Sequence, residues 1–138
     1  MRQCHKNIAL IALLLSGLAF SAFAQEEEGK GEKVMDMDTA AEKEAERLGE
    51  VLKLEDWQIF YTDSILRHDY GEMQREVQQL QATGVSRRDL FLDVQDKWME
   101  KADAALEKLF TPAQWKKYLR DGAGRRIKER EKRKKDRQ

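Results

Sequence analysis

The sequence is short of the residues on which most catalytic chemistry depends. Its 138 residues include one cysteine, one proline and two histidines. The cysteine is Cys4, so residues 25–138 have no thiol for a disulfide, a thiolate metal site or a cysteine nucleophile. They also contain no glycine-rich phosphate loop, and His68 is their only histidine. We therefore expect a protein that is not an enzyme and that needs no cofactor.

His68 is the one residue in this part of the chain that raises the question of a metal. It lies four residues before Glu72, which places the two side chains on one face of a helix, beside Asp69. A zinc site usually has three or four protein ligands, and no second histidine is present in residues 25–138. We favour an exposed helical histidine beside acidic residues, and a weak metal site is the alternative.

Long hydrophobic runs are also scarce, and the one that exists is at the amino terminus. Residues 8–24 are mostly apolar, follow the basic Arg2 and Lys6, and end on small residues at Ala24. A membrane span needs roughly 20 apolar residues, so this run is short for an anchor, which is the alternative. The order of charge, apolar core and small residues predicts a secretory signal, residues 1–24, cleaved after Ala24.

Charge is balanced over the whole chain but not along it. Residues 25–124 carry 15 Lys and Arg against 23 Asp and Glu, whereas residues 125–138 carry nine basic and three acidic side chains. We expect a flexible acidic leader at 25–38, a helical domain at 39–121 and a basic tail at 122–138. The candidate electrostatic residues of the tail are Arg125, Arg126, Lys128, Arg130, Lys132, Arg133, Lys134 and Lys135.

The tail is open to several interpretations. Its glutamates stand four residues before basic residues, which supports a solvated helix, and a solubilising tail is the interpretation we favour. The alternatives are attraction to anionic lipid headgroups at a membrane surface, to an acidic client or to the acidic body of a neighbouring copy. Nucleic acid is not expected as a partner of an exported protein.

Between leader and tail the apolar residues follow helical periods. A capping box at Thr39 predicts the start of a first helix. A narrow, coiled-coil type stripe from Leu66 to Leu80 predicts a long helix over 55–82, and Gly84 with Ser86 predicts the turn into a third helix that ends at Leu109. Two long helices joined by a short turn form an antiparallel hairpin, so the predicted fold class is all-α with four helices.

The single proline belongs to a helix start. In "FTPAQW", Thr111 can cap a new helix, Pro112 falls at its first position and Gln114 completes a capping box. An earlier stretch, "LEDWQ" at 54–58, has the same outline of an apolar residue, a polar residue, two others and a glutamine. This pair resembles the two L-T-x-x-Q pentapeptides that flank a helical hairpin in the Spy/CpxP family of periplasmic stress proteins. Glu55 and Phe110 depart from that pattern.

The resemblance, which covers about residues 48–121, implies a curved, cradle-shaped helical homodimer in the periplasm. Spy-like members bind unfolded proteins without ATP, and CpxP-like members damp an envelope stress sensor. We therefore expect a chaperone or stress protein for unfolded or envelope proteins, with a regulatory adaptor or a structural binder acting through the tail as the alternatives. By the resemblance, the structural corners would be Leu54, Gln58, Phe110, Thr111 and Gln114, with Pro112 inside the second motif.

Aromatic and methionine side chains are the candidates for partner contact. Trp57, Phe60 and Tyr61 stand at the first pentapeptide, and we favour a packing role for the aromatic residues because large rings supply much of a thin core. The alternative places some of them on an exposed face that holds clients. The candidate protein-binding residues are Met73, Met99, Trp98 and Trp115.

Overall fold

The computed structural model describes residues 36–138, and this part of the chain is all-α, as predicted. It contains α1 (Met37–Leu52), α2 (Asp56–Ala82), α3 (Arg88–Leu109), α4 (Pro112–Tyr118), a short π-helical segment η1 (Leu119–Ala123) and α5 (Gly124–Lys135). Because η1 joins α4 to α5 without a loop, residues 36–138 form four helical segments, and no strand occurs among them. The predicted signal sequence and nearly all of the predicted leader lie outside the described residues.

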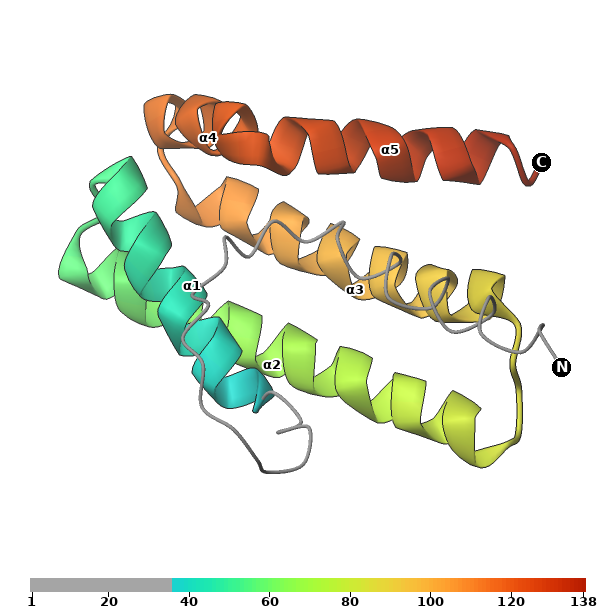
Figure 1. Cartoon of the computed structure of the whole chain (residues 1–138). Helices are drawn as coiled ribbons and strands as arrows, with labels where there is room; N and C mark the ends of the chain where they lie inside the picture. Colours follow the sequence, from blue (N-terminus) through green and yellow to red (C-terminus); the bar gives the residue numbers. More distant parts are fainter. Residues whose placement is uncertain (1–35) are drawn as a thin grey trace, which may run out of the picture. The chain divides into compact units, whose positions relative to one another are not determined.

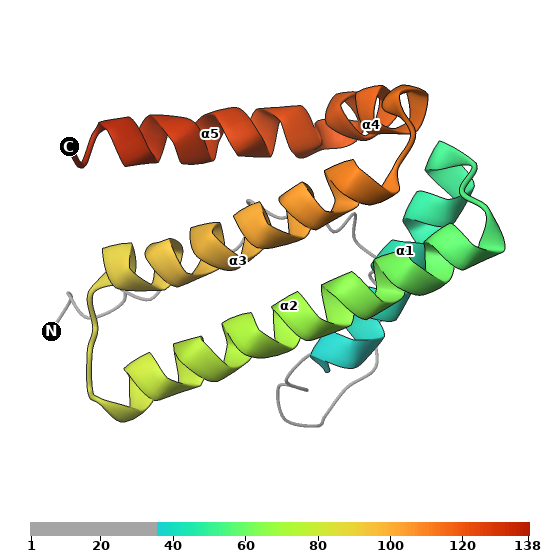
Figure 2. The same cartoon turned by 180° about the vertical axis from the view of Figure 1, so that it is seen from behind.

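The two long helices form the predicted hairpin. In both views α2 and α3 lie side by side and antiparallel, with α1 packed against α2 (Figures 1 and 2). Gly84 takes the expected left-handed conformation, with a φ of 73°, in the turn after α2. The predicted start of α3 at Ser86 is wrong, because Arg87 holds the N-cap position and pairs through its guanidinium with Asp89.

The first helix also begins earlier than predicted. Asp36 is its N-cap, and the carboxylate accepts hydrogen bonds from the backbone N–H of Asp38 at 3.3 Å and from the hydroxyl of Thr39 at 3.0 Å. The Thr39 hydroxyl therefore donates to an earlier cap and does not itself cap the helix. The boundary between the predicted leader and the helical domain consequently moves to Asp36.

The apolar core lies where α1, α2, α3 and α4 meet. Leu48 of α1 and Leu106 of α3 are almost completely buried, and Leu66 of α2 joins them. The α1–α2 contact is close: a Cβ atom added to Gly49 would fall 2.7 Å from Cδ1 of Ile59. The buried cluster consists of Ala41, Leu48, Leu52, Leu54, Leu66, Ala102, Leu106, Phe110, Tyr118 and Ala123.

The basic tail is folded against α3 through charged side chains. Helix α5 runs antiparallel to α3 at its outer side (Figures 1 and 2). The only residue of α5 that is buried is Arg130, which pairs with Asp103 of α3. One face of the helix that we expected to be solvated is thus used for intramolecular packing, because α3 presents acidic side chains to it.

Candidate functional site

The two pentapeptides meet at one corner of the fold, although 56 residues separate them in the sequence. Thr111 caps α4: its hydroxyl accepts from the backbone N–H of Gln114 at 3.3 Å, and Pro112 takes the first helical position, as predicted. Glu55 occupies the N-cap position of α2 in the first motif. Leu54 and Phe110, the apolar residues of the two motifs, belong to the same buried cluster.

The two glutamines of the motifs bind each other directly. Nε2 of Gln58 donates to Oε1 of Gln114 at 2.8 Å, and Nε2 of Gln114 donates to Oε1 of Gln58 at 3.0 Å. Each amide oxygen also accepts from the backbone N–H of its own N-cap residue, Glu55 at 3.0 Å and Thr111 at 2.9 Å. Gln58 is buried, so this pairing satisfies polar atoms that water does not reach.

The remaining amide hydrogens tie each motif to the helix that precedes the other. Gln58 donates to the carbonyl of Leu109 at 3.3 Å, and Gln114 donates to the carbonyl of Lys53 at 3.4 Å. Lys53 and Leu109 each stand five residues before the glutamine of their own motif, so the corner has an approximate two-fold symmetry. The corner therefore fixes the ends of α1 and α3 relative to the starts of α2 and α4.

Three aromatic side chains stand on the outside of this corner. Trp57, Phe60 and Tyr61, which we call the exposed aromatic cluster, are 51%, 66% and 53% exposed. The Tyr61 ring meets Trp57 edge-on with centroids 6.3 Å apart and meets Phe60 edge-on at 5.5 Å. The indole N–H of Trp57 donates to Oε2 of Glu55 at 2.5 Å. The cluster is thus an exposed apolar surface whose rings are held by one another and by the helix cap.

The helical phase of α2 explains why these rings face water. The buried residues Gln58, Thr62, Leu66 and Asp69 recur every three or four positions and define the inner face. At 100° per residue, Trp57 and Phe60 lie about 135° and 165° from the middle of that face, and Tyr61 lies at its flank, about 95° away. Our preference for packing as the role of the aromatic residues is therefore wrong for these three. Helical phase alone does not separate Tyr61 from the inner face, because it lies only about 60° from Gln58 at 100° per residue.

The four candidate protein-binding residues are buried or half-buried, unlike the exposed aromatic cluster. Trp98 is buried, with the ammonium groups of Lys97 and Lys101 over its ring at 5.0 and 4.0 Å. Trp115 is half-buried and packs against Tyr118, with ring centroids 5.3 Å apart. Met73 of α2 and Met99 of α3 are likewise half-buried. Trp98 therefore contributes to packing, and the exposed apolar surface is formed by residues outside the candidate set.

His68 is engaged with its neighbours. Its Nδ1 lies 2.8 Å from Oδ1 of Asp69, and its ring meets that of Trp98 with centroids 6.1 Å apart. Within residues 36–138, no group of three or more His, Cys, Asp or Glu side chains is close enough to hold a metal ion.

Burial raises the pKa of two tyrosine hydroxyls, those of Tyr70 and Tyr118. Burial raises the pKa of Tyr70 to about 12. The pKa of Tyr118 is raised as well, because of burial and the nearby negative charge of Asp103, whose Oδ1 accepts from its hydroxyl at 2.8 Å. Both tyrosines are therefore neutral and act as part of the packed interior.

The basic side chains of the tail divide into two groups. Four form ion pairs with acidic residues of α3: Arg130 with Asp103, Arg133 with Asp96, Lys134 with Glu100 and Arg137 with Asp93. The others remain on the surface or at its edge: Arg125, Lys128, Lys132 and Lys135 are exposed, and Arg126 is half-buried.

No protein-family model matches this chain, and no curated protein or solved structure matches it either. The resemblance to the Spy/CpxP family stays a prediction. The part of the chain that the structure describes includes no helix long and apolar enough to cross a membrane. Residues 36–138 have an exposed apolar surface at the corner and a basic surface along α5.

Proposed function

We propose that this protein is a periplasmic, ATP-independent chaperone of the Spy/CpxP type, and that its exposed aromatic cluster holds apolar segments of unfolded envelope proteins. The observation that carries the proposal is the cluster itself, three adjacent aromatic side chains that are each more than half exposed. Isolated exposed apolar residues are ordinary on protein surfaces, whereas adjacent ones mark contact sites.

The setting of the cluster supports this role. The hydrogen bond from Trp57 to Glu55 and the edge-on contacts of Tyr61 with the other two rings hold the cluster, so the rings lose little conformational freedom when a client binds. Aromatic side chains dominate the energetics of protein contacts because they bury a large area with few rotatable bonds. Ile59, next to the cluster in sequence, lines a hollow of about 500 Å³ that also has two carboxylates and one ammonium group, from Glu46, Glu50 and Lys53. Its net charge of −1 attracts the basic segments of clients.

The test is suppression of aggregation of a reduced, unfolding client in buffer without nucleotide, followed by light scattering. Wild-type protein at equimolar amounts is expected to delay aggregation. The triple variant Trp57→Ser, Phe60→Ser, Tyr61→Ser is expected to lose most of this effect, because it removes the apolar contact area. Circular dichroism of each variant checks that the helices are kept.

Two matched variants control for the number of substitutions. Trp57→Phe, Phe60→Tyr, Tyr61→Phe keeps aromatic area and should retain protection. Gln78→Ser, Gln79→Ser, Gln81→Ser changes three exposed polar residues far along α2 and should be silent. Full protection by a folded triple serine variant at the cluster would refute the proposal.

A regulatory adaptor is the second candidate, and the small size of the cluster favours it. Three residues within two helical turns form an anchor of the size found at the centre of a specific interface. An adaptor is expected to retain one partner at fixed stoichiometry from envelope extract, whereas a chaperone retains many proteins.

The proposed curved homodimer predicts an elongated particle of twice the chain mass in light scattering and small-angle X-ray scattering.

A further inference from the structure

The basic side chains of α5 serve two different faces. On the inner face, Arg133 binds Asp96 through two hydrogen bonds of 2.8 and 2.7 Å, and Lys134 lies 2.5 Å from Glu100. Arg130 and Arg137 complete this face by pairing with two more aspartates of α3. The inner cations are therefore neutralised within the chain and are not available to a partner.

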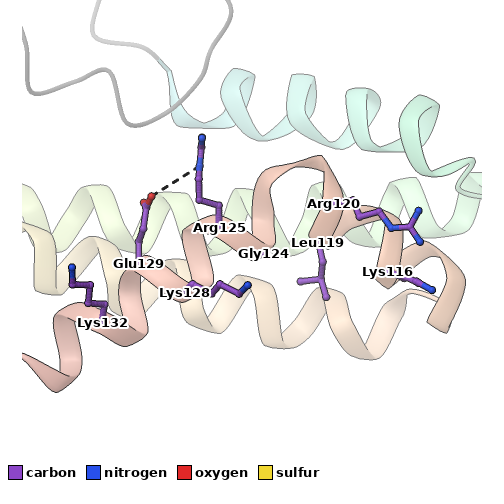
Figure 3. A pocket seen from close by; sticks show the side chains of 8 residues that line it. All are labelled: Lys116, Leu119, Arg120, Gly124, Arg125, Lys128, Glu129 and Lys132. Atoms are coloured by element: carbon purple, nitrogen blue, oxygen red, sulfur yellow. Dashed lines mark ion pairs between the residues drawn. The ribbon is translucent and has the colours of Figure 1, made fainter.

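The outer face carries a separate basic groove. A hollow of about 660 Å³ runs along α4, η1 and α5, and its cations come from all three segments (Figure 3). We call this feature the basic groove. Its cationic side chains are Lys116, Arg120, Arg125, Lys128 and Lys132.

The backbone shapes this groove at the π-helical segment. Gly122 has a φ of 116°, which side chains other than glycine rarely adopt, and it interrupts the regular helix there. A Cβ atom on Gly124 would fall 2.9 Å from the carbonyl oxygen of Leu119. Leu119 and Gly124 both line the groove, so its wall at this point depends on the absence of a side chain at Gly124. The groove is thus built by the kink between α4 and α5.

The charge of the groove is largely uncompensated. Its single carboxylate, Glu129, lies 4.0 Å from Arg125. Within residues 36–138, the other four cations form no ion pair with an acidic side chain. They recur at intervals of four and eight residues from Lys116 to Lys132, and within α5 alone the cations from Arg125 to Lys132 extend over about 10 Å at 1.5 Å per residue. One small phosphate ligand is much shorter than this row, so the row fits an array of anions.

We propose that the basic groove binds the phosphate headgroups of an anionic lipid bilayer and holds the protein at the membrane surface. Rows of four to eight Lys and Arg on a helix are attracted to anionic membranes by about 1 kcal/mol for each charge. Lysine predominates in the row, and its ammonium group binds phosphate as a point charge without fixed geometry. The groove has no aromatic lining residue on which nucleic-acid bases could stack, which disfavours single-stranded nucleic acid.

Attachment through this groove is peripheral. Leu119 is its only large apolar lining residue, and it is half-buried, so the bilayer gains little apolar area from contact. The attraction is therefore electrostatic and must weaken as salt is added. The exposed aromatic cluster lies on α2 and is not part of the groove, so the two sites can be tested independently.

The experiment measures co-sedimentation with vesicles, using the protein as recovered from cells with its amino terminus read by mass spectrometry. Vesicles contain either phosphatidylcholine alone or phosphatidylcholine with about 30% phosphatidylglycerol, an anionic lipid. Wild-type protein is expected to bind only the anionic vesicles and to dissociate at high salt. Lys128→Gln with Lys132→Gln should weaken binding about fivefold for each lysine, or about 25-fold together.

The control is Lys43→Gln with Lys108→Gln, which changes net charge equally at exposed lysines outside the groove. It should weaken binding less than about twofold. Equal losses from both pairs, or equal binding to neutral vesicles, would overturn the proposal. So would tighter binding to soluble polyphosphate or to a duplex oligonucleotide than to anionic vesicles. Client protection should be unchanged in Lys128→Gln with Lys132→Gln, so failure here is distinct from failure of the proposed chaperone function.

Discussion

Where α1 meets α2 and α3, the helices touch through aliphatic side chains, whereas α5 meets α3 through arginine, lysine and carboxylate. Every buried leucine of the described residues lies between Leu48 and Leu106, and α5 buries no apolar residue. The same chain thus contains an apolar-packed body, α1 to α4, and an ion-paired edge, α5.

The difference matters because the two kinds of contact respond to different conditions. Apolar burial depends little on salt, while salt weakens the attraction between exposed charges, with a Debye length of about 8 Å at physiological ionic strength. Exposed pairs such as Lys134–Glu100 contribute about 0–1 kcal/mol, but the buried Arg130–Asp103 pair becomes costly once one partner is removed. We therefore expect the edge to separate from α3 under conditions in which the body remains folded.

The largest expected effect is in the body. Leu106→Ala opens a cavity at a residue with no exposed surface and should lower the free energy of unfolding by about 2–5 kcal/mol. Urea unfolding followed by circular dichroism measures this loss. Leu80→Ala, at a half-buried position far along α2, is the matched control and should cost less. Equal losses would mean that the core is not concentrated where α1, α2 and α3 meet.

The glutamine pair is the polar part of the body and the next largest expected effect. Gln58→Ala leaves the amide of Gln114 and the N–H of Glu55 without their partner and should cost about 1–3 kcal/mol. In a double-mutant cycle with Gln114→Ala, the two losses should not add, because they remove the same interaction. Additive losses would show that the two motifs are stabilised separately.

The edge should respond locally. Arg130→Met leaves Asp103 buried without its cation, so α5 should detach, and hydrogen exchange of amides 124–135 should accelerate at least about tenfold. The urea midpoint of the body should change little. Lys132→Met, on the outer face, is the control. If Arg130→Met lowers the midpoint as much as Leu106→Ala does, the body and the edge are one cooperative unit.

The smallest effect appears only at alkaline pH. The pKa of Tyr70 is raised to about 12 from its ordinary value of 10, so the folded state keeps a proton that the unfolded state releases. This contribution is complete below pH 10 and is lost as pH rises from about 10 to about 12. Raising the pH from 9 to 11 should lower the free energy of unfolding of both proteins. The loss should be about 1 kcal/mol larger for wild type than for Tyr70→Phe. Equal alkaline destabilisation of wild type and Tyr70→Phe would contradict this contribution.

Much of the corner could be predicted from the sequence, because capping is a local property. Thr111, Pro112 and Gln114 are close in the chain, so their hydrogen bonds follow from residue type and spacing. The reciprocal bond between Gln58 and Gln114 joins residues 56 positions apart, and the repeated pentapeptide indicated only that the two motifs were related. The start of α1 was misplaced because two local caps competed, and the carboxylate of Asp36 prevailed over the hydroxyl of Thr39.

By itself the sequence determined the all-α class, the hairpin and the helix start at Thr111, since periodicity, turn residues and caps act within a few positions. Only the tertiary structure decided which side chains face water. The exposure of the three rings of the exposed aromatic cluster and of the cations of α5 depends on what packs against each helix. Composition carries no information about that packing. Burial is a property of the whole arrangement, because a side chain is covered only when a residue distant in the chain lies over it.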